Sequence, residues 1–284
     1  MEKILFNSQY FNIKDTLECG QIFRFVEYDN GYLVHSLDKC AYCYNDGDKT
    51  VVECEKEDVN YFYNYFDLGR DYSLIHKSAL KENITVLTEA ANNGKGIRIL
   101  RQDTVEMMFS FIVSQNNNIP RIKGIIEKLC LNLGEKKKFK DVEYFTFPTL
   151  NKMTEKDESF YKSIGLGYRA EYIRRLAEYL VNGKIVPEKF NTLSTKELKK
   201  ALTQIHGVGQ KVADCVSLFG FNRSDSFPVD TWIEKVYIDD FKGNIKDRAK
   251  IADYFVERFG FNAGYFQQYL FHYKRSKEKT ELKV

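Results

Sequence analysis

The stretch Leu202-Thr-Gln-Ile-His-Gly-Val-Gly-Gln-Lys-Val-Ala-Asp-Cys215 carries the strongest structural signal in this 284-residue sequence. It predicts a helix that ends near Ile205, a tight turn with Gly207 and Gly209, and a second helix from about Gln210. Both glycines permit positive φ and close backbone approach. The free N–H groups at the start of the second helix would form an anion site suited to a phosphate. An ordinary helical hairpin with a glycine turn is the alternative.

Lys211 falls in the first turn of that second helix. A cation at this end opposes the helix dipole, so helix propensity does not explain the lysine. When such a lysine is withdrawn from water, its neutral form is favoured, and the neutral amine is the nucleophilic form. The alternative is a lysine that only contacts a phosphate.

A second signal, Phe227-Pro-Val-Asp-Thr-Trp232, follows shortly after the hairpin. Pro228 ends an irregular loop, and Asp230 is placed to cap a helix that begins at Thr231. The capping role is compatible with a chemical one. A carboxylate beside a reacting sugar stabilises oxocarbenium-like charge and helps to position an amine.

The composition is typical of a globular protein with a sizeable core, with 43% hydrophobic and 29% charged residues. No apolar run reaches the roughly 18 residues of a membrane span, and the N-terminus lacks the pattern of a secretion signal. We therefore expect no membrane association and a cytoplasmic location, near the nucleoid in a prokaryote. Residues 1–97 contain 10 Lys and Arg against 16 Asp and Glu, whereas residues 98–284 contain 33 against 24. The basic C-terminal part fits a polyanionic partner, and a solvated surface is the alternative.

The six cysteines do not have the density of a secreted disulfide scaffold. Cys40 and Cys43 form the only close pair, and no two further ligands stand at a workable spacing for a metal. We interpret the pair as strand residues on one face of a sheet. We expect neither a metal nor a cofactor for the chemistry. A monovalent or calcium ion bound to the hairpin through backbone carbonyls is the alternative that stays open.

The fold class is predicted as α+β, with an N-terminal antiparallel sheet domain over residues 1–97. Hairpin signals lie at residues 29–31 and 45–47, and helices are expected over 58–66 and 79–91. The glycine-containing segment 92–96 is a candidate boundary. The predicted strands are Ile22–Tyr28, Tyr32–Leu37, Lys39–Tyr44 and Thr50–Cys54.

Beyond this boundary the strand signals vanish, and residues 98–275 are predicted as a helical body. Asp103 and Glu106 have the spacing of a capping box, as do Ser194 and Glu197. Residues 136–140 are interpreted as a basic loop and residues 276–284 as a frayed polar tail. The expected helices are 103–114, 120–134, 169–181, one after Ser194, 231–239, 246–259 and 263–275.

Taken together, the hairpin and the Pro-Val-Asp loop resemble the helix-hairpin-helix glycosylases, and within them the 8-oxoguanine DNA glycosylases. The likeness runs from about Leu17 to Phe271. It implies a monomer that binds double-stranded DNA, flips an oxidised purine out of the duplex and excises it. It also implies that Lys211 attacks C1′ of the deoxyribose, that Asp230 assists, and that β-elimination then nicks the strand.

The resemblance further assigns a base pocket. Cys19-Gly-Gln-Ile-Phe-Arg24 is similar to a family segment in which the carbonyl of Gly20 accepts N7–H of the lesion, which ordinary guanine lacks. Gln267 would bind the Watson–Crick edge of the base, and Phe271, four residues on and on the same helix face, would stack on it. Cys215 would form the opposite wall, and Pro228 belongs to the same pocket.

The implied DNA contacts lie on two further segments. In Ser110–Arg121, Asn116 would fill the gap left by the flipped base, and Arg121 would contact the orphaned base. In Gly165–Arg169, Tyr168 would wedge into the stack while Arg169 contacts the same orphaned base. Two arginines are suited to the acceptors of cytosine, so we expect a preference for a lesion opposite cytosine. A helix-cap loop at residues 116–118 and simple surface packing of Tyr168 are the alternatives.

Two departures and two rival functions complete the prediction. Trp232 stands where familiar members have a phosphate-contacting His, and it is left out of the site. The C-terminal four-cysteine cluster of the iron–sulfur branch is absent, since Cys215 is the last cysteine. The rivals are a glycosylase for alkylated purines, whose branch lacks the lysine, and a non-catalytic DNA-binding protein that uses the hairpin as a clamp.

Overall fold

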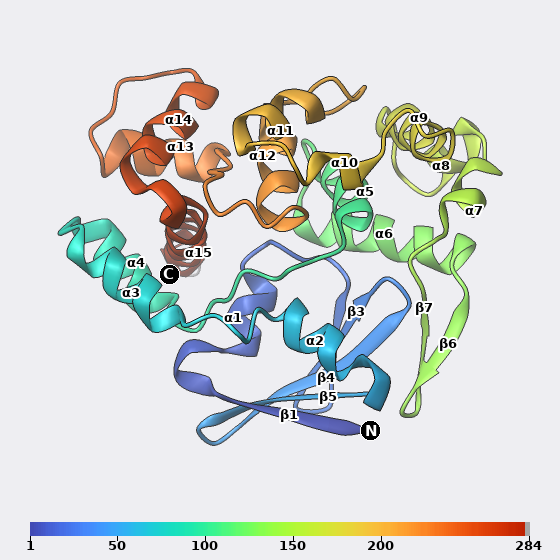
Figure 1. The fold of residues 1–284 in the computed structure, drawn as a ribbon, viewed down its shortest axis with the longest axis horizontal. Helices are drawn as coiled ribbons and strands as arrows, with labels where there is room; N and C mark the ends of the chain where they lie inside the picture. The colour runs from blue at the N-terminus through green and yellow to red at the C-terminus, as the bar shows by residue number, and fades with distance from the viewer. Residues whose placement is uncertain (282–284) are drawn as a thin grey trace.

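The computed structural model describes residues 1–281, with side chains up to residue 277. Its N-terminal part is a five-stranded antiparallel sheet in the order β1-β5-β4-β3-β2, which lies below the helices in Figure 1. Residues in the left-handed region, Asp29 (φ 50°) and Gly47 (φ 55°), close two of its hairpins, as the turn signals predicted. The strands are β1 (Glu2–Asn7), β2 (Phe25–Tyr28), β3 (Gly31–Ser36), β4 (Lys39–Asp46) and β5 (Lys49–Cys54).

The edges of the sheet differ from the prediction in two places. Strand β1 was not predicted, and it pairs with β5 along its whole length. Strand β2 begins at Phe25 rather than Ile22, because the segment before it is held by hydrogen bonds to another part of the chain and not by a neighbouring strand. The buried side chain of Gln21 donates to the carbonyl of Arg98 (2.7 Å) and accepts from the N–H of Leu100 (2.8 Å). These bonds fix the segment that contains Gly20 against the start of the helical body.

Short helices connect the sheet to the body, and of these α1 and α2 pack on the sheet. The expected helix over 79–91 is two helices, because Asn83 takes a left-handed conformation (φ 53°) between them. The elements are η1 (Ser8–Tyr10), α1 (Ile13–Glu18), η2 (Lys56–Asp58), α2 (Val59–Tyr65), α3 (Tyr72–Lys81) and α4 (Thr85–Asn93).

The helical body confirms the α+β fold class. In Figure 1, helix α6 lies directly above the sheet, between it and the helices at the upper right of the view. The body comprises α5 (Thr104–Ser114), α6 (Ile119–Leu133), α7 (Leu150–Thr154), α8 (Glu158–Ser163), α9 (Arg169–Val181), α10 (Pro187–Phe190), α11 (Thr195–Leu202), α12 (Gln210–Phe219), α13 (Thr231–Asp239), α14 (Arg248–Phe259), η3 (Gly260–Asn262) and α15 (Ala263–Glu281).

The lysine-rich segment predicted as a loop is a hairpin of β6 (Lys136–Phe139) and β7 (Val142–Phe145). Lys140 makes its turn in the left-handed region (φ 52°). Tyr144 stacks on His35 of the main sheet, with ring centroids 5.0 Å apart. Contacts with the sheet therefore stabilise the hairpin. Such contacts cannot be predicted from the strand propensity of the segment itself.

A buried ion pair joins the sheet domain to the body. Arg24 Nη1 lies 3.2 Å from Glu106 Oε1, and both side chains are nearly inaccessible to solvent. Glu106 also accepts the N–H of Leu37 at 2.8 Å. Asp103 caps α5 as predicted, but Glu106 does not complete a capping box, because its carboxylate is engaged across the domain interface.

The hydrophobic cores interleave on both sides of the predicted boundary at residue 97. Tyr72, Ala79 and Leu87, from α3 and α4, belong to the core of the helical body, whereas Leu100 belongs to the core of the sheet. In Figure 1, α4 lies beside α15 although the two are far apart in sequence. Helices near the N-terminus thus help to position the last helix.

Helix α15 continues through residues 276–281, which were predicted as a frayed tail, and residues 282–284 lie outside the described part. Cys40 and Cys43 are buried on opposite faces of the sheet rather than on one face, since each belongs to a different core. Among the described residues, no cluster of potential metal ligands is found and no helix is long and apolar enough to cross a membrane.

Candidate active site

The predicted helical hairpin is formed by α11, a turn and α12. Gly207 has φ +83°, and a Cβ built on it would lie 2.3 Å from the ring of Tyr172. Gly209 does not use positive φ as expected: it precedes α12 with φ −85°. A Cβ on Gly209 would meet no heavy atom within 4 Å. The turn therefore needs Gly207 for its conformation, whereas Gly209 leaves the surface open.

The N-terminus of α12 has no side-chain cap. Gln210, the first residue of the helix, turns its amide toward the carboxylate of Asp214 at 3.3 Å. The first N–H groups of α12 thus have no side-chain acceptor and are free for an external anion. This arrangement agrees with the predicted phosphate site.

Lys211 and Asp230 lie near each other, on the first turn of α12 and before α13. Asp230 accepts the N–H groups of Trp232 and Ile233 at 3.0 Å each, which confirms it as the cap of α13. Burial raises the pKa of the Asp230 carboxyl, and the positive charge of nearby Lys211 opposes the rise. The positive charge of Lys211 thus acts on a partly desolvated carboxylate.

Cys215 lies one turn after Lys211 on the same face of α12. Burial raises the pKa of its thiol to about 11, and Lys211 again opposes the rise. The thiol is therefore protonated at neutral pH and acts as an apolar wall. The amine of Lys211 also lies 5.5 Å from the ring centroid of Phe111, so its surroundings are partly apolar.

The predicted pocket residues of α15 meet those of the N-terminal segment. Gly20 takes φ +90°, and a Cβ built on it would lie 3.1 Å from Phe271 Cε1. Gln267 is buried and donates to the carbonyl of Pro228 at 3.1 Å, while its own oxygen accepts from Gln268 at 2.7 Å.

A groove of about 670 Å³ lies between the sheet domain and the body. Gly20 contributes to its lining from the N-terminal segment, Pro120 from α6 and Arg275 from α15. Sequence reasoning missed Arg275, although its spacing from Gln267 and Phe271 repeats every four residues and indicates a shared helix face.

The predicted wedge residues are exposed at the loop before α6 and at the start of α9. Asn116 has a left-handed backbone (φ 44°) and an exposed side chain. Tyr168 is 52% exposed and packs edge-on against Tyr172. Arg121 is exposed, and its guanidinium lies 3.4 Å from the carbonyl of Gly165. These three side chains are available to a partner.

Arg169 is placed differently from the expectation of a direct base contact. It is only 3% exposed. Its guanidinium donates to the carbonyls of Gln115, Asn116 and Leu166. A buried cation that is satisfied by backbone carbonyls holds the Asn116 loop in place, so Arg169 supports the loop of the predicted wedge residue Asn116 and does not present its own charge.

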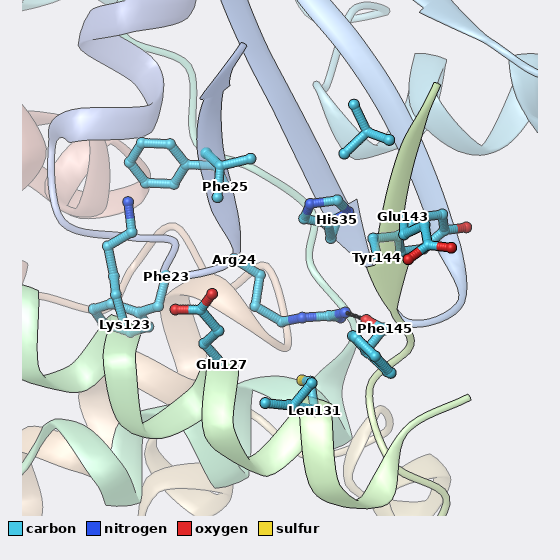
Figure 2. A pocket seen from close by; sticks show the side chains of 13 residues that line it. Phe23, Arg24, Phe25, His35, Lys123, Glu127, Leu131, Glu143, Tyr144 and Phe145 are labelled. Atoms are coloured by element: carbon cyan, nitrogen blue, oxygen red, sulfur yellow. Dashed lines mark hydrogen bonds between the residues drawn. The ribbon is translucent and has the colours of Figure 1, made fainter. Parts of the chain in front are cut away.

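Figure 2 shows a second cavity, of about 250 Å³, between the sheet, α6 and β7. Arg24 crosses it and donates to the carbonyl of Phe145 at 2.8 Å. Lys123 lies with its amine 3.7 Å from the ring centroid of Phe25. None of the residues predicted for catalysis or DNA contact lines this cavity, so it is separate from the Lys211–Asp230 site.

Two family models match the chain. Residues 3–108 match the N-terminal domain of 8-oxoguanine DNA glycosylase, and residues 109–260 match the HhH-GPD superfamily of base excision DNA repair proteins. The N-glycosylase/DNA lyase OGG1 of Arabidopsis thaliana is 32% identical, over 68% of this chain and 56% of that protein. The N-glycosylase/DNA lyase of Saccharomyces cerevisiae is 30% identical, over 84% of this chain and 71% of that protein.

Solved structures agree along nearly the whole chain. MBOgg1 in complex with a low-affinity DNA ligand has a TM-score of 0.92 at 38% identity and covers 97% of this chain and 96% of its own. The 8-oxoguanine glycosylase/lyase of Clostridium acetobutylicum, in complex with double-stranded DNA containing cytosine opposite 8-oxoG, has a TM-score of 0.90 at 36% identity, covering 95% and 93%.

The chain combines a sheet domain, a helical body, a helical hairpin that carries Lys211 and a helix-capping aspartate in a Pro-Val-Asp loop. These features define a helix-hairpin-helix base-excision glycosylase. Within that class, the chain belongs to the 8-oxoguanine DNA glycosylase family. It is a DNA-binding enzyme of base-excision repair with N-glycosylase and DNA lyase activity.

Proposed function

We propose that the protein acts as a monomer on duplex DNA, extrudes 8-oxoguanine paired with cytosine, and excises it through Lys211. The observation that carries the proposal is the position of Lys211, on an uncapped helix start beside the partly desolvated carboxylate of Asp230. The printed substrate of the Clostridium acetobutylicum relative supports the choice of lesion and of opposite base.

In the proposed reaction the lone pair of Lys211 Nζ forms a bond to C1′ as the bond from C1′ to the base breaks. The base leaves with the bonding electrons and takes up a proton, which balances the proton that the attacking amine loses. The Asp230 carboxylate stabilises the positive charge that develops on the sugar. The amine–sugar adduct opens to a Schiff base, and β-elimination then expels the 3′ phosphate and nicks the strand.

Borohydride trapping tests the role of Lys211. Wild-type protein incubated with duplex DNA containing 8-oxoguanine opposite cytosine should form a covalent adduct on reduction. Lys211→Gln should form none, whereas Lys250→Gln, at an exposed position on α14, should trap like the wild type. Adducts that persist in Lys211→Gln would assign the nucleophile to another residue.

The substrate choice needs a separate experiment. Base release from duplexes with 8-oxoguanine opposite each of the four bases should be fastest opposite cytosine. Release of methylated purines with no release of 8-oxoguanine would instead favour the alkylated-purine function. DNA binding without any base release would favour the clamp function.

Asp230→Asn separates chemistry from helix capping. Asparagine also accepts the N–H groups at a helix N-terminus, so the stability of α13 should change little. Excision should fall by roughly a hundredfold or more, because the neutral amide does not stabilise the developing charge. Equal excision by Asp230→Asn and the wild type would confine Asp230 to its capping role.

A further inference from the structure

Arg275 links the last helix to the N-terminal segment beside the proposed base pocket. It lies one turn beyond Phe271 on α15, and its guanidinium is 5.2 Å from the Phe271 ring centroid. One terminal nitrogen, Nη2, donates to the backbone carbonyl of Glu18. The other, Nη1, would lie 3.2 Å from a Cβ on Gly20. The side chain therefore sits between two residues already assigned to the pocket.

The Nη1 atom is buried and has no hydrogen-bond partner. Arginine keeps its charge at every physiological pH. The side chain therefore cannot avoid the cost of an N–H donor without an acceptor by losing a proton. The carboxylates whose charges act on it are those of Glu18 and Asp230. Burial raises the pKa of the neighbouring Cys19 thiol to about 12, so this thiol is uncharged at neutral pH. An unused charge-assisted donor at a pocket wall is a common sign of a missing acceptor.

The position of this donor indicates which chemical group would accept its hydrogen bond. Arg275 and Gly20 both line the groove between the domains, and the guanidinium lies 5.2 Å from the ring centroid of Phe271, the residue predicted to stack on the base. A DNA phosphate would remain at the solvent-exposed surface of the duplex, whereas a flipped base is inserted into the protein. A buried donor here suits the base.

We infer that Arg275 is a base-contacting residue that donates from Nη1 to a carbonyl oxygen of the extruded base. The inference rests on the proposed function, and 8-oxoguanine offers two such oxygens, at C6 and C8. Phe271 would provide the stacking surface, while Arg275 would provide a charged hydrogen bond at the edge of the base. The contact forms only when a base is present.

That condition supplies the test. We compare Arg275→Met with wild type in two single-turnover reactions: excision of 8-oxoguanine opposite cytosine, and strand cleavage at a preformed abasic site. Excision should fall by roughly 10- to 100-fold, the usual effect of losing a hydrogen bond to a charged group. Cleavage at the abasic site should remain close to wild type, because no base occupies the pocket.

Two further variants serve as controls. Arg275→Lys keeps a cationic donor and should recover part of the excision rate. Arg258→Met, which removes an exposed arginine of α14, should leave both reactions unchanged. Retained abasic-site cleavage also shows that Arg275→Met is folded.

The outcomes separate the possibilities. Unchanged excision by Arg275→Met, or equal loss in both reactions, would overturn the inference, since the latter indicates a phosphate contact or a structural role. A wild-type protein that cleaves abasic sites but releases no 8-oxoguanine would instead refute the proposed function, and this inference with it.

Discussion

Gln115 donates its side-chain amide to the backbone carbonyl of Gly207 at 2.8 Å. This bond joins the end of the α5 helix, where the Asn116 loop begins, to the turn of the hairpin. Arg169 holds the same loop from the other side through the carbonyls of Gln115 and Asn116. The proposed wedge and the proposed phosphate site therefore form one connected unit, and a distortion of the turn should affect both.

Gly207→Ala should destabilise the hairpin. An alanine at this position would have to adopt positive φ, and its methyl group would overlap the Tyr172 ring. Together these effects should lower the free energy of unfolding by about 2–4 kcal/mol. DNA affinity should fall as well, because the turn moves. Urea unfolding and fluorescence anisotropy with a duplex measure the two effects. Wild-type stability in this variant would contradict the structure of the turn.

Gly209→Ala provides the matched comparison. Its φ suits any residue and the added Cβ meets no protein atom, so stability should stay within about 0.5 kcal/mol of wild type. The methyl group would, however, stand where a phosphate approaches the N–H groups of α12. We expect weaker DNA binding at unchanged stability, and unaltered binding would argue against an anion at this helix end.

The two arginines near the wedge should behave differently. Arg121→Ala removes an exposed side chain, so it should leave stability nearly unchanged but reduce the preference for cytosine by roughly tenfold. Arg169→Ala leaves buried carbonyls without a donor and should cost about 2–4 kcal/mol of stability. Excision rates opposite the four bases and urea unfolding distinguish them. If Arg169→Ala were stable and lost only its preference among opposite bases, the result would support a direct contact between Arg169 and the opposite base.

The ion pair between the domains should be sensitive to the loss of one partner. Glu106→Gln preserves the shape of the side chain but leaves Arg24 buried without a counter-charge, which should cost about 3–5 kcal/mol. Glu234→Gln breaks the more exposed pair with Arg248 and should cost no more than about 1 kcal/mol. Chemical denaturation measures both, and similar values would show that the burial of the Arg24–Glu106 pair has little energetic effect.

Asp214 should make stability depend on pH. Burial raises the pKa of this carboxyl to about 6, although Lys199, 3.2 Å away, opposes the rise. The folded protein therefore holds the proton more tightly than the unfolded chain, whose carboxyl titrates near 4. Stability from this group is present below about pH 4 and decreases as the pH rises to about 6, by about 3 kcal/mol in total.

Asp214→Asn tests this pH dependence. The variant should lose less stability than wild type between pH 4.5 and pH 7, measured by urea unfolding at several pH values. Asp141→Asn, at an exposed turn, should follow the wild-type profile. Parallel profiles for Asp214→Asn and wild type would place the titration of Asp214 outside this range.

Local signals allowed much of the site to be predicted. A glycine turn, an uncompensated lysine at a helix start and an aspartate cap each depend on neighbouring residues, and the structure has the α12 helix and the Asp230 cap where the sequence placed them. The β6–β7 hairpin was missed because its stabilising contacts, such as Tyr144 on His35, come from the distant sheet.

The sequence by itself determined the hairpin, the helix caps and the residue types available for chemistry, because these follow from backbone preferences over a few residues. Only the tertiary structure decided which side chains meet. It brought Gly20 against Phe271 from opposite ends of the chain, buried Arg169 among backbone carbonyls, and left the Nη1 atom of Arg275 without an acceptor. Such contacts depend on how the two domains pack, and packing between distant segments leaves no periodic signal in the sequence.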